Sequence, residues 1–420
     1  MFARLRGDFP ILDVRIGESP LSYLDSGATS QKPQCVIDTF TEYFQQRNSA
    51  VHRGAHSLAV EATDAFENGR IAVAGLVGGK PKQVCWTKNA TEALNVVALG
   101  IDRASRGFGG EAAQRFALGP EDSIVITEME HHANLVPWQQ LAASTGAQLR
   151  WLPVTDSGEL DLTDLESIVD ETTKVFAFTH VSNVLGTINP VDTLVARARE
   201  VGAYVVLDAC QSVPHMPVDF VDLDVDFAAF SAHKALGPTG LGALWGKSEL
   251  LDALPPVLTG GSMITTVTMD QTEFMPAPQR FEAGTQPVAE VAAFATAVGY
   301  LAEVGLEEIF AHERELGRLL LDGIAEIPGI RVLGSAPERI GTVAFDVDGV
   351  HAHDVGQFLD SQGVAVRVGH HCAQPLHRRF GVTASTRAST YLYNNAEDCD
   401  RFLSALAEVR PFFGVAQEGE

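Results

Sequence analysis

Two residues of opposite charge each end a short apolar run in the middle of the chain. The run 225–234 ends in Lys234, and the run 203–208 ends in Asp208. The alternative to a functional role is that Lys234 is an ordinary surface residue and Asp208 an ordinary turn residue. Both runs resemble strands of one sheet, and ligands of open α/β sheets bind at carboxyl strand ends. The pair suits pyridoxal phosphate, which needs an amine that binds it covalently and a carboxylate that keeps its ring nitrogen protonated.

A phosphate site is indicated by the segment 84–99, which reads as a strand, a polar turn and an apolar helix. The start of a helix offers free N–H groups and the positive end of the helix dipole to an anion. The alternative is that Asn89 or Thr91 only caps the helix.

Two histidines follow the next predicted strand, 123–127. His131 could stack on a planar ring or exchange protons with a substrate. A lone histidine is more often a structural residue, but His131 and His132 in tandem at a strand end weaken that interpretation.

A cysteine near the C-terminus lies in a loop that also contains Arg367, His370 and His371. Positive charge beside a thiol favours the reactive thiolate, so we expect Cys372 to be the reactive cysteine. A zinc site made by His370, His371, Cys372 and His377 is an alternative. Adjacent side chains point in divergent directions, which disfavours zinc.

The other four cysteines are widely spaced and are expected to be small core residues: Cys35, Cys85, Cys210 and Cys399. Five cysteines are few and odd in number, which fits reduced thiols rather than a disulfide framework.

Further strands are expected at 149–154, 175–179 and 241–245, with helices between them such as 191–201. This alternation predicts an α/β fold with a mostly parallel sheet. Small residues in the turn 25–29 indicate close approach of the backbone to another group.

The composition changes beyond residue 260. Residues 259–262 and 275–278 read as loop, and a long apolar helix is expected over 288–304. A smaller α+β unit follows, with strands near 342–346 and 365–367 and helices near 353–361 and 396–409. We therefore divide the chain into an N-terminal segment that packs with the small domain (1–25), a large domain (26–295) and a small domain that carries the cysteine loop (296–420).

The 420 residues carry a net charge of −24, which argues against nucleic acid or an anionic membrane as the main partner. No apolar run approaches the ~20 residues that span a bilayer. The N-terminus has arginines but no apolar segment after them, so we expect no secretory signal and a cytoplasmic protein.

Six motifs in order give the chain a resemblance over nearly its whole length. They are Val-His-Arg-Gly at 51–54, Glu-Met-Glu-His-His-Ala-Asn at 128–134, Asp-Ala-Cys-Gln at 208–211, Ser-x-His-Lys at 231–234, Arg-Phe-Glu-Ala-Gly-Thr at 280–285 and Arg-x-Gly-His-His-Cys at 367–372. The chain resembles SUF-type (group II) cysteine desulfurases, which are fold-type I pyridoxal-phosphate transferases of the aminotransferase class V superfamily. The resemblance implies a large domain with a mostly parallel sheet and a smaller α+β C-terminal domain.

The resemblance also implies a role for each matching residue. Lys234 would bind the cofactor, His131 would stack on its ring, Asp208 would pair with the pyridine nitrogen and Gln211 would contact the ring oxygen. The phosphate would be held by Thr91, Ser231 and His233, and by Thr285 from the neighbouring subunit of a homodimer. The substrate L-cysteine would contact Asn183, Arg387, Arg367 and His56, with Arg387 gripping the carboxylate at two points.

The reaction implied by the resemblance converts L-cysteine to L-alanine and leaves a persulfide on Cys372. The sulfur would pass to a small acceptor protein of the SUF system, such as a zinc-containing scaffold, and on to iron–sulfur clusters. His353 would take over one zinc position during that transfer. Selenocysteine lyase and a catalytically silent sulfur-relay or scaffold protein are the alternatives.

The sequence departs from the family pattern at a few places. Ala232 stands where glycine is frequent, Ala235 and Leu236 follow the lysine in place of bulkier pairs, and Gln286 and Pro287 follow Thr285. A surface insertion longer than usual is expected over 104–118.

Overall fold

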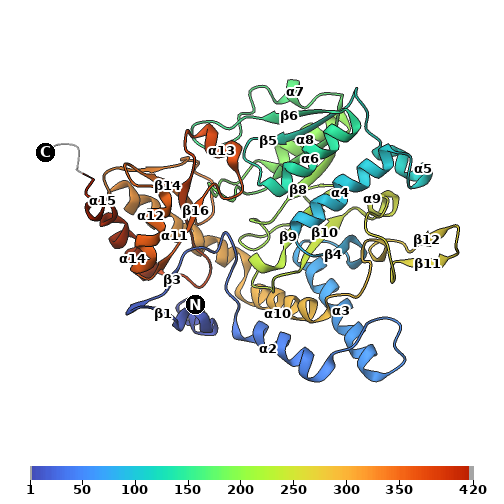
Figure 1. The fold of residues 1–420 in the computed structure, drawn as a ribbon, viewed down its shortest axis with the longest axis horizontal. Coiled ribbons are helices and arrows are strands. Elements are labelled where there is room, and N and C mark those ends of the chain that lie inside the picture. Colours follow the sequence, from blue (N-terminus) through green and yellow to red (C-terminus); the bar gives the residue numbers. More distant parts are fainter. Residues whose placement is uncertain (1, 416–420) are drawn as a thin grey trace.

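A seven-stranded sheet forms the centre of the larger lobe in the computed structural model, which describes residues 2–415 (Figure 1). The strands lie in the order β4 (Val84–Thr87), β10 (Gly242–Gly246), β9 (Phe227–Ser231), β8 (Tyr204–Asp208), β7 (Thr173–Thr179), β5 (Ser123–Thr127) and β6 (Gln148–Leu152). Strand β10 runs antiparallel to both of its neighbours, and the other pairs are parallel. The predicted mostly parallel α/β sheet is therefore confirmed.

Helices cover both faces of this sheet because successive side chains of a buried strand point to opposite sides. In β8, Val205 and Leu207 join one core cluster and Val206 joins the other. The first cluster is covered by α3 (Ser57–Leu76), α8 (Val191–Val201) and α10 (Val288–Val304). The second cluster is covered by α4 (Ala90–Ser105), α6 (Val136–Thr145) and α9 (Ser248–Ala253).

The pairing of β8 with β9 fixes the positions of the acid and the amine. The two strands are parallel, with Asp208 opposite Ala229. Strand β9 ends at Ser231, and a short 3-10 turn, Ala232–Lys234, follows it. Both charged groups therefore emerge at one edge of the sheet.

The smaller lobe contains a four-stranded antiparallel sheet in the order β13 (Ile330–Val332), β14 (Thr342–Val347), β17 (Ser385–Ser389) and β16 (Arg367–Gly369). Its helices are α11 (Leu306–Ala325), α12 (Ala352–Ser361), α13 (Gln374–Arg379), α14 (Ala396–Ala407) and α15 (Val409–Phe412). Figure 1 shows this lobe, in orange and red, beside the larger lobe.

The N-terminal segment packs on the smaller lobe. Strand β3 (Ser22–Tyr23) pairs in parallel with β15 (Val364–Ala365), and Arg6 forms an ion pair of 2.9 Å with the buried carboxylate of Asp398. This segment also contains α1 (Phe2–Leu5), β1 (Arg15–Ile16) and β2 (Ser19–Pro20), and α2 (Gln34–Glu42) follows it. The predicted domain boundary at residue 295 lies inside α10, and this helix packs on α2 and α3 of the chain before it. The limits of the domains therefore stay predictions.

Two segments contain short regular elements that the sequence did not predict, although the surface position expected for 104–118 is borne out by the exposure of residues 106–112. Residues 104–118 contain the end of α4, the short helix α5 (Gly110–Ala113) and a 3-10 turn, and Ala113 and Phe116 are buried in the core below α4. The loops predicted at 259–262 and 275–278 are confirmed, and between them lies a hairpin of β11 (Ile264–Val267) and β12 (Thr272–Phe274), which was not predicted and projects from the larger lobe (Figure 1). Its strands are mostly exposed, so no apolar alternation marks them. The larger lobe also contains the short helix α7 (Leu165–Ile168), between β6 and β7.

Among the described residues, no single helix has the length and apolarity needed to cross a bilayer. Helices α10 and α11, bent by 75° relative to each other, meet these criteria only as a pair, by length and composition.

Candidate active site

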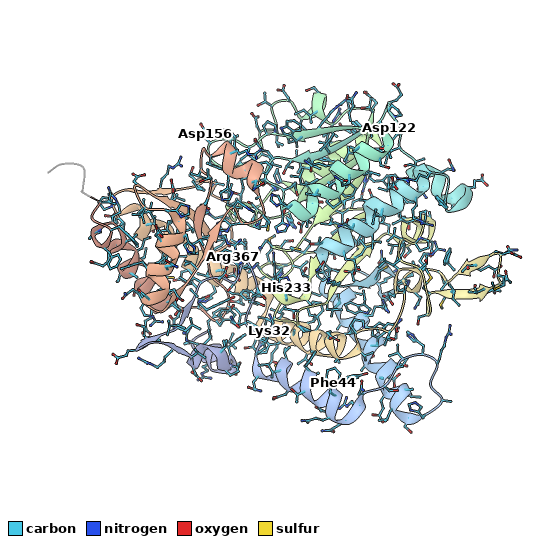
Figure 2. The ribbon with its side chains drawn as sticks, in the orientation of Figure 1. Lys32, Phe44, Asp122, Asp156, His233 and Arg367 are labelled. Carbon is cyan, nitrogen blue, oxygen red and sulfur yellow. The ribbon has the colours of Figure 1, made fainter. Side chains whose placement is uncertain are left out.

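A cavity of about 260 Å³ lies where the two lobes meet. From the larger lobe it is lined by Lys234, Asp208 and His131, and from the smaller lobe by Arg387 and Cys372. Figure 2 labels two further lining residues, His233 and Arg367, near the middle of the molecule. The cavity therefore collects groups from strand ends of both sheets.

The edge of the cavity near β8 is polar and buried. Asp208 is 4% exposed and accepts the N–H of Cys210 at Oδ1 (3.0 Å). Gln211 donates from Nε2 to the carbonyl oxygen of Gly27 (2.8 Å), and its buried Oε1 has no partner. An amine at Lys234, a buried carboxylate and an unpaired amide oxygen fit the polar atoms of pyridoxal phosphate.

The opposite edge is formed by the start of α4. Asn89 caps this helix by accepting the N–H of Glu92 (2.9 Å), so the capping interpretation holds for Asn89. Ser231 Oγ accepts the N–H of Ala90 (2.9 Å), which ties the helix start to the end of β9. Thr91 lines the cavity and stays exposed. A helix N-terminus with hydroxyl groups beside it suits a phosphate group.

Two histidines of the larger lobe line the cavity in neutral form. Burial, followed by the charge of Lys234, lowers the pKa of His131 to about 4. His131 Nδ1 accepts the N–H of Ala133 (3.0 Å), so the proton of the neutral ring is on Nε2. Burial, with Lys234 and Lys32, lowers the pKa of His233 to about 3. His131 can therefore offer a proton from Nε2 toward a group in the cavity.

Two arginines share one carboxylate at the small-lobe side. Arg367 contacts Asp25 through Nε (3.1 Å) and Nη2 (2.8 Å), and Arg387 Nη2 lies 3.4 Å from the same carboxylate. Arg387 also donates to the carbonyl oxygen of Asn183 (2.7 Å), while its Nε has no partner. Burial lowers the pKa of Arg387, and Asp25 opposes that shift. A buried, incompletely paired guanidinium is a strong site for a substrate carboxylate.

Cys372 lies in the loop between β16 and α13 and is exposed. The φ angles of His371 (48°) and Cys372 (55°) are in the left-handed region, which side chains disfavour. Asn183 Nδ2 donates to the carbonyl oxygen of His371 (2.8 Å), which fastens the loop to the larger lobe. The thiol is therefore held at the cavity mouth by a strained segment.

The imidazoles considered for zinc make hydrogen bonds instead. Nε2 of His371 and Nε2 of His377 both lie within 3.0 Å of Ser385 Oγ. Within residues 2–415 no three His, Cys, Asp or Glu side chains are arranged to hold a metal ion.

The expectation of four core cysteines was right for two of them. Cys85 and Cys399 are buried. Cys35 is exposed on α2, and Cys210 lines the cavity beside Asp208. Burial, followed by the charge of Asp208, raises the pKa of Cys210, so this second thiol stays protonated.

Three predicted site residues do not line this cavity. Thr285 lines a separate depression near Thr87. His56 caps α3 by accepting the N–H of Ala59 (3.3 Å) and is exposed. His353 is exposed in the first turn of α12. The roles assigned to these residues, including the contribution of Thr285 to a second subunit, stay predictions.

Sequence reasoning missed Asp25, which pairs with both arginines. The small residues of the turn 25–29 could have pointed to Asp25, because they predicted that the backbone there approaches another group closely. The structure confirms this close approach. A Cβ atom placed on Gly27 would lie 3.1 Å from Cζ and Nη2 of Arg387. Any larger residue at this position would press on the guanidinium.

The fold and the cavity define the class of fold-type I enzymes that depend on pyridoxal phosphate. The chain belongs to the class-V aminotransferase family, whose model matches residues 22–402.

Three similar proteins are named as cysteine desulfurases or probable cysteine desulfurases. The chain is 53% identical to a probable cysteine desulfurase 2 of Mycobacterium leprae, over 98% of this chain and 97% of the relative. It is 49% identical, with the same coverage, to a probable cysteine desulfurase of Streptomyces coelicolor. An apo structure of a cysteine desulfurase from Thermococcus onnurineus matches with a TM-score of 0.89 and 36% identity, over 97% of both chains.

Proposed function

We propose that the chain is a cysteine desulfurase that converts L-cysteine to L-alanine and collects the sulfur as a persulfide on Cys372. One observation carries the proposal: the thiol of Cys372 and the amine of Lys234 line the same cavity, although they lie on different lobes. The relatives named as cysteine desulfurases support the same activity.

The residues of the cavity divide into those for the cofactor and those for the substrate. We assign the cofactor to Lys234, Asp208, Gln211 and His131, with its phosphate at Thr91, Ser231 and His233. Bound there, pyridoxal phosphate supplies a ring that accepts the electrons released at the substrate α-carbon. Arg387 orients the substrate by binding its carboxylate, and Asn183 and Arg367 border the same region.

Two residues, Lys234 and His131, carry out the proton transfers. The amine of Lys234 removes the proton from the α-carbon, because it lines the cavity at the cofactor position. His131 is neutral, with its proton on Nε2, and can exchange that proton with the substrate thiol.

Cys372 receives the sulfur. Its thiolate attacks the substrate sulfur and forms an S–S bond, while the C–S bond breaks and its electron pair stays with the carbon. That carbon takes up a proton and leaves as alanine. L-cysteine and the enzyme thiol thus become L-alanine and the enzyme persulfide, with no external oxidant or reductant.

We further propose that the chain acts as a cytoplasmic homodimer of SUF type. Thr285 would complete the phosphate site of the second subunit, and a small acceptor protein, such as a zinc-containing scaffold, would take the sulfur for iron–sulfur clusters. His353 is exposed, so it is accessible to that acceptor.

Mass spectrometry of the holoenzyme after L-cysteine treatment tests the activity. We expect one added sulfur on the peptide that contains Cys372, with alanine formed in equal amount. Cys372→Ala should lose this alanine production, and Cys35→Ala, which removes an exposed thiol outside the cavity, should retain it.

Three results would contradict the proposal. Sulfur found on another cysteine would remove Cys372 from its role. Cys372→Ala could lose turnover of L-cysteine but still turn over L-selenocysteine faster than the wild type turns over L-cysteine. That result would favour selenocysteine lyase. A preparation that binds no pyridoxal phosphate would favour a silent sulfur-relay protein.

A further inference from the structure

Two imidazole rings hold the backbone around Cys372. His370 Nδ1 accepts the N–H of Cys372 (3.1 Å), and His132 Nε2 accepts the N–H of Gln374 (3.2 Å). The backbone N–H of His132 also donates to the carbonyl oxygen of Cys372 (2.7 Å). His132 comes from the turn after β5, so it joins the larger lobe to the loop at Cys372 and at Gln374.

The loop needs such support because its conformation is unfavourable. His371 and Cys372 are consecutive non-glycine residues in the left-handed region, and Gly369 has a φ angle of 117°. Such a conformation persists only where surrounding contacts impose it. Removing one of those contacts should let the loop relax and carry the thiol away from its present position.

We propose that His132 is a positioning residue for Cys372, whose ring holds residues 370–374 in the conformation that keeps the thiol at the cavity. This inference rests on the proposed function, in which the thiol must reach the substrate sulfur and later an acceptor. His132 itself does not line the cavity, so its effect is exerted through the loop.

The bond from Gln374 depends on the protonation of the ring. Nε2 can accept a hydrogen bond only while it carries no proton. Burial, followed by the neighbouring His370, lowers the pKa of His132, which favours the accepting form. The titratable rings beside His132 are His131 from its own segment and His370 from the loop, and Cys372 contacts His132 through its backbone carbonyl. Protonation of His132 should therefore loosen the loop.

Residue-resolved hydrogen exchange of the full-length holoenzyme tests the bond directly. In His132→Phe we expect exchange at the Gln374 amide to be roughly fivefold faster, the factor given by loss of one ordinary hydrogen bond. His132→Gln, which retains an acceptor oxygen, should stay near the wild-type rate. Turnover of L-cysteine should show a lower kcat in His132→Phe with little change in KM, and His132→Gln should recover much of it.

Acidification tests the role of the proton without any substitution. As the pH is lowered stepwise below 6.5, the exchange of the Gln374 amide in the wild type should accelerate relative to His132→Gln measured at the same pH, since the amide side chain does not titrate. A purely structural histidine would give no such difference.

The control is His351→Phe, which removes an imidazole that accepts the N–H of His353 at the start of α12. It should leave the Gln374 amide unchanged. Equal Gln374 exchange in the wild type and His132→Phe would overturn the role of His132, whatever the turnover. A wild-type enzyme that exchanges as expected but forms no alanine from L-cysteine would overturn the proposed function and leave the role in the loop standing.

Discussion

Burial of uncharged imidazoles is the main electrostatic feature at the residue scale. His131, His233 and His371 line the cavity, and burial is the first cause of the lowered pKa of each. His180, at the end of β7, is 5% exposed, and burial alone lowers its pKa to about 4. An imidazolium in this region would lack solvation, so the folded protein excludes protons from these rings.

His180 predicts how the stability of the protein depends on pH. Between its ordinary pKa of 6.5 and the folded value of about 4, the unfolded chain binds a proton that the folded chain does not. Stability should therefore fall as the pH drops through this window, by roughly 2 kcal/mol between pH 7 and pH 5 from this residue. Urea unfolding of the wild type and His180→Leu at both pH values measures the difference.

The comparison between the two proteins is the informative quantity in that experiment. His180→Leu should lose less stability on acidification than the wild type does. The same loss in both proteins would show that His180 does not contribute to the acid sensitivity.

At the scale of elements, the turn after β3 approaches the guanidinium of Arg387 closely. Gly27 donates its N–H to Ser389 Oγ (2.8 Å) and accepts from Gln211 at its carbonyl oxygen (2.8 Å). This turn therefore joins the N-terminal segment, β17 and the turn after β8 around the cavity. The absence of a side chain at Gly27 leaves room for this contact.

Gly27→Ala should disturb substrate binding more than the fold. The added Cβ would lie 3.1 Å from the Arg387 guanidinium and from Ser389 Oγ, so the arginine must shift. We expect KM for L-cysteine to rise about tenfold or more, because one misplaced charged contact costs on the order of 1.5 kcal/mol or more. Steady-state kinetics of the holoenzyme measure it.

Gly75→Ala is the matched control, since a Cβ at this position of α3 meets no atom within 4 Å. It should leave KM unchanged and increase stability slightly, because alanine favours a helix. Equal KM values for wild type and Gly27→Ala would contradict the proposed carboxylate site at Arg387.

At the scale of the whole molecule, a buried pair connects the two lobes. His215 Nδ1, in the turn after β8, lies 2.9 Å from the carboxylate of Glu313 on α11. Both side chains are at most 2% exposed, and burial raises the pKa of Glu313. Tyr391 packs edge-on against the same ring and donates to the carbonyl oxygen of Pro214 (2.9 Å).

Removing one member of this pair should destabilise the protein strongly. In Glu313→Ala the buried imidazole of His215 loses its partner, and we expect a loss of about 3 kcal/mol or more in the free energy of unfolding. Glu315→Ala, on the exposed side of the same helix, should change it by less than about 0.5 kcal/mol. Chemical denaturation of the three proteins compares them. Similar midpoints for wild type and Glu313→Ala would show that the pair does not hold the lobes together.

Much of the architecture was determined by the sequence alone. Apolar runs that end in Asp208 and Lys234 predicted two strands with their charged ends at one edge, because parallel strands bring their carboxyl ends together. The helix over 288–304 was also found, since its apolar pattern is long. The exposed hairpin of β11 and β12 was missed because its side chains face solvent and carry no apolar pattern.

Only the tertiary structure decided which distant segments meet at the cavity. Asp25 pairs with Arg367 across 342 positions, and His132 supports Gln374 across 242 positions. Local propensity and periodicity report on neighbours within an element, whereas these contacts depend on how two lobes pack. The sequence therefore determined the reactive groups and the strand ends that carry them, and packing decided which partners hold each group in place.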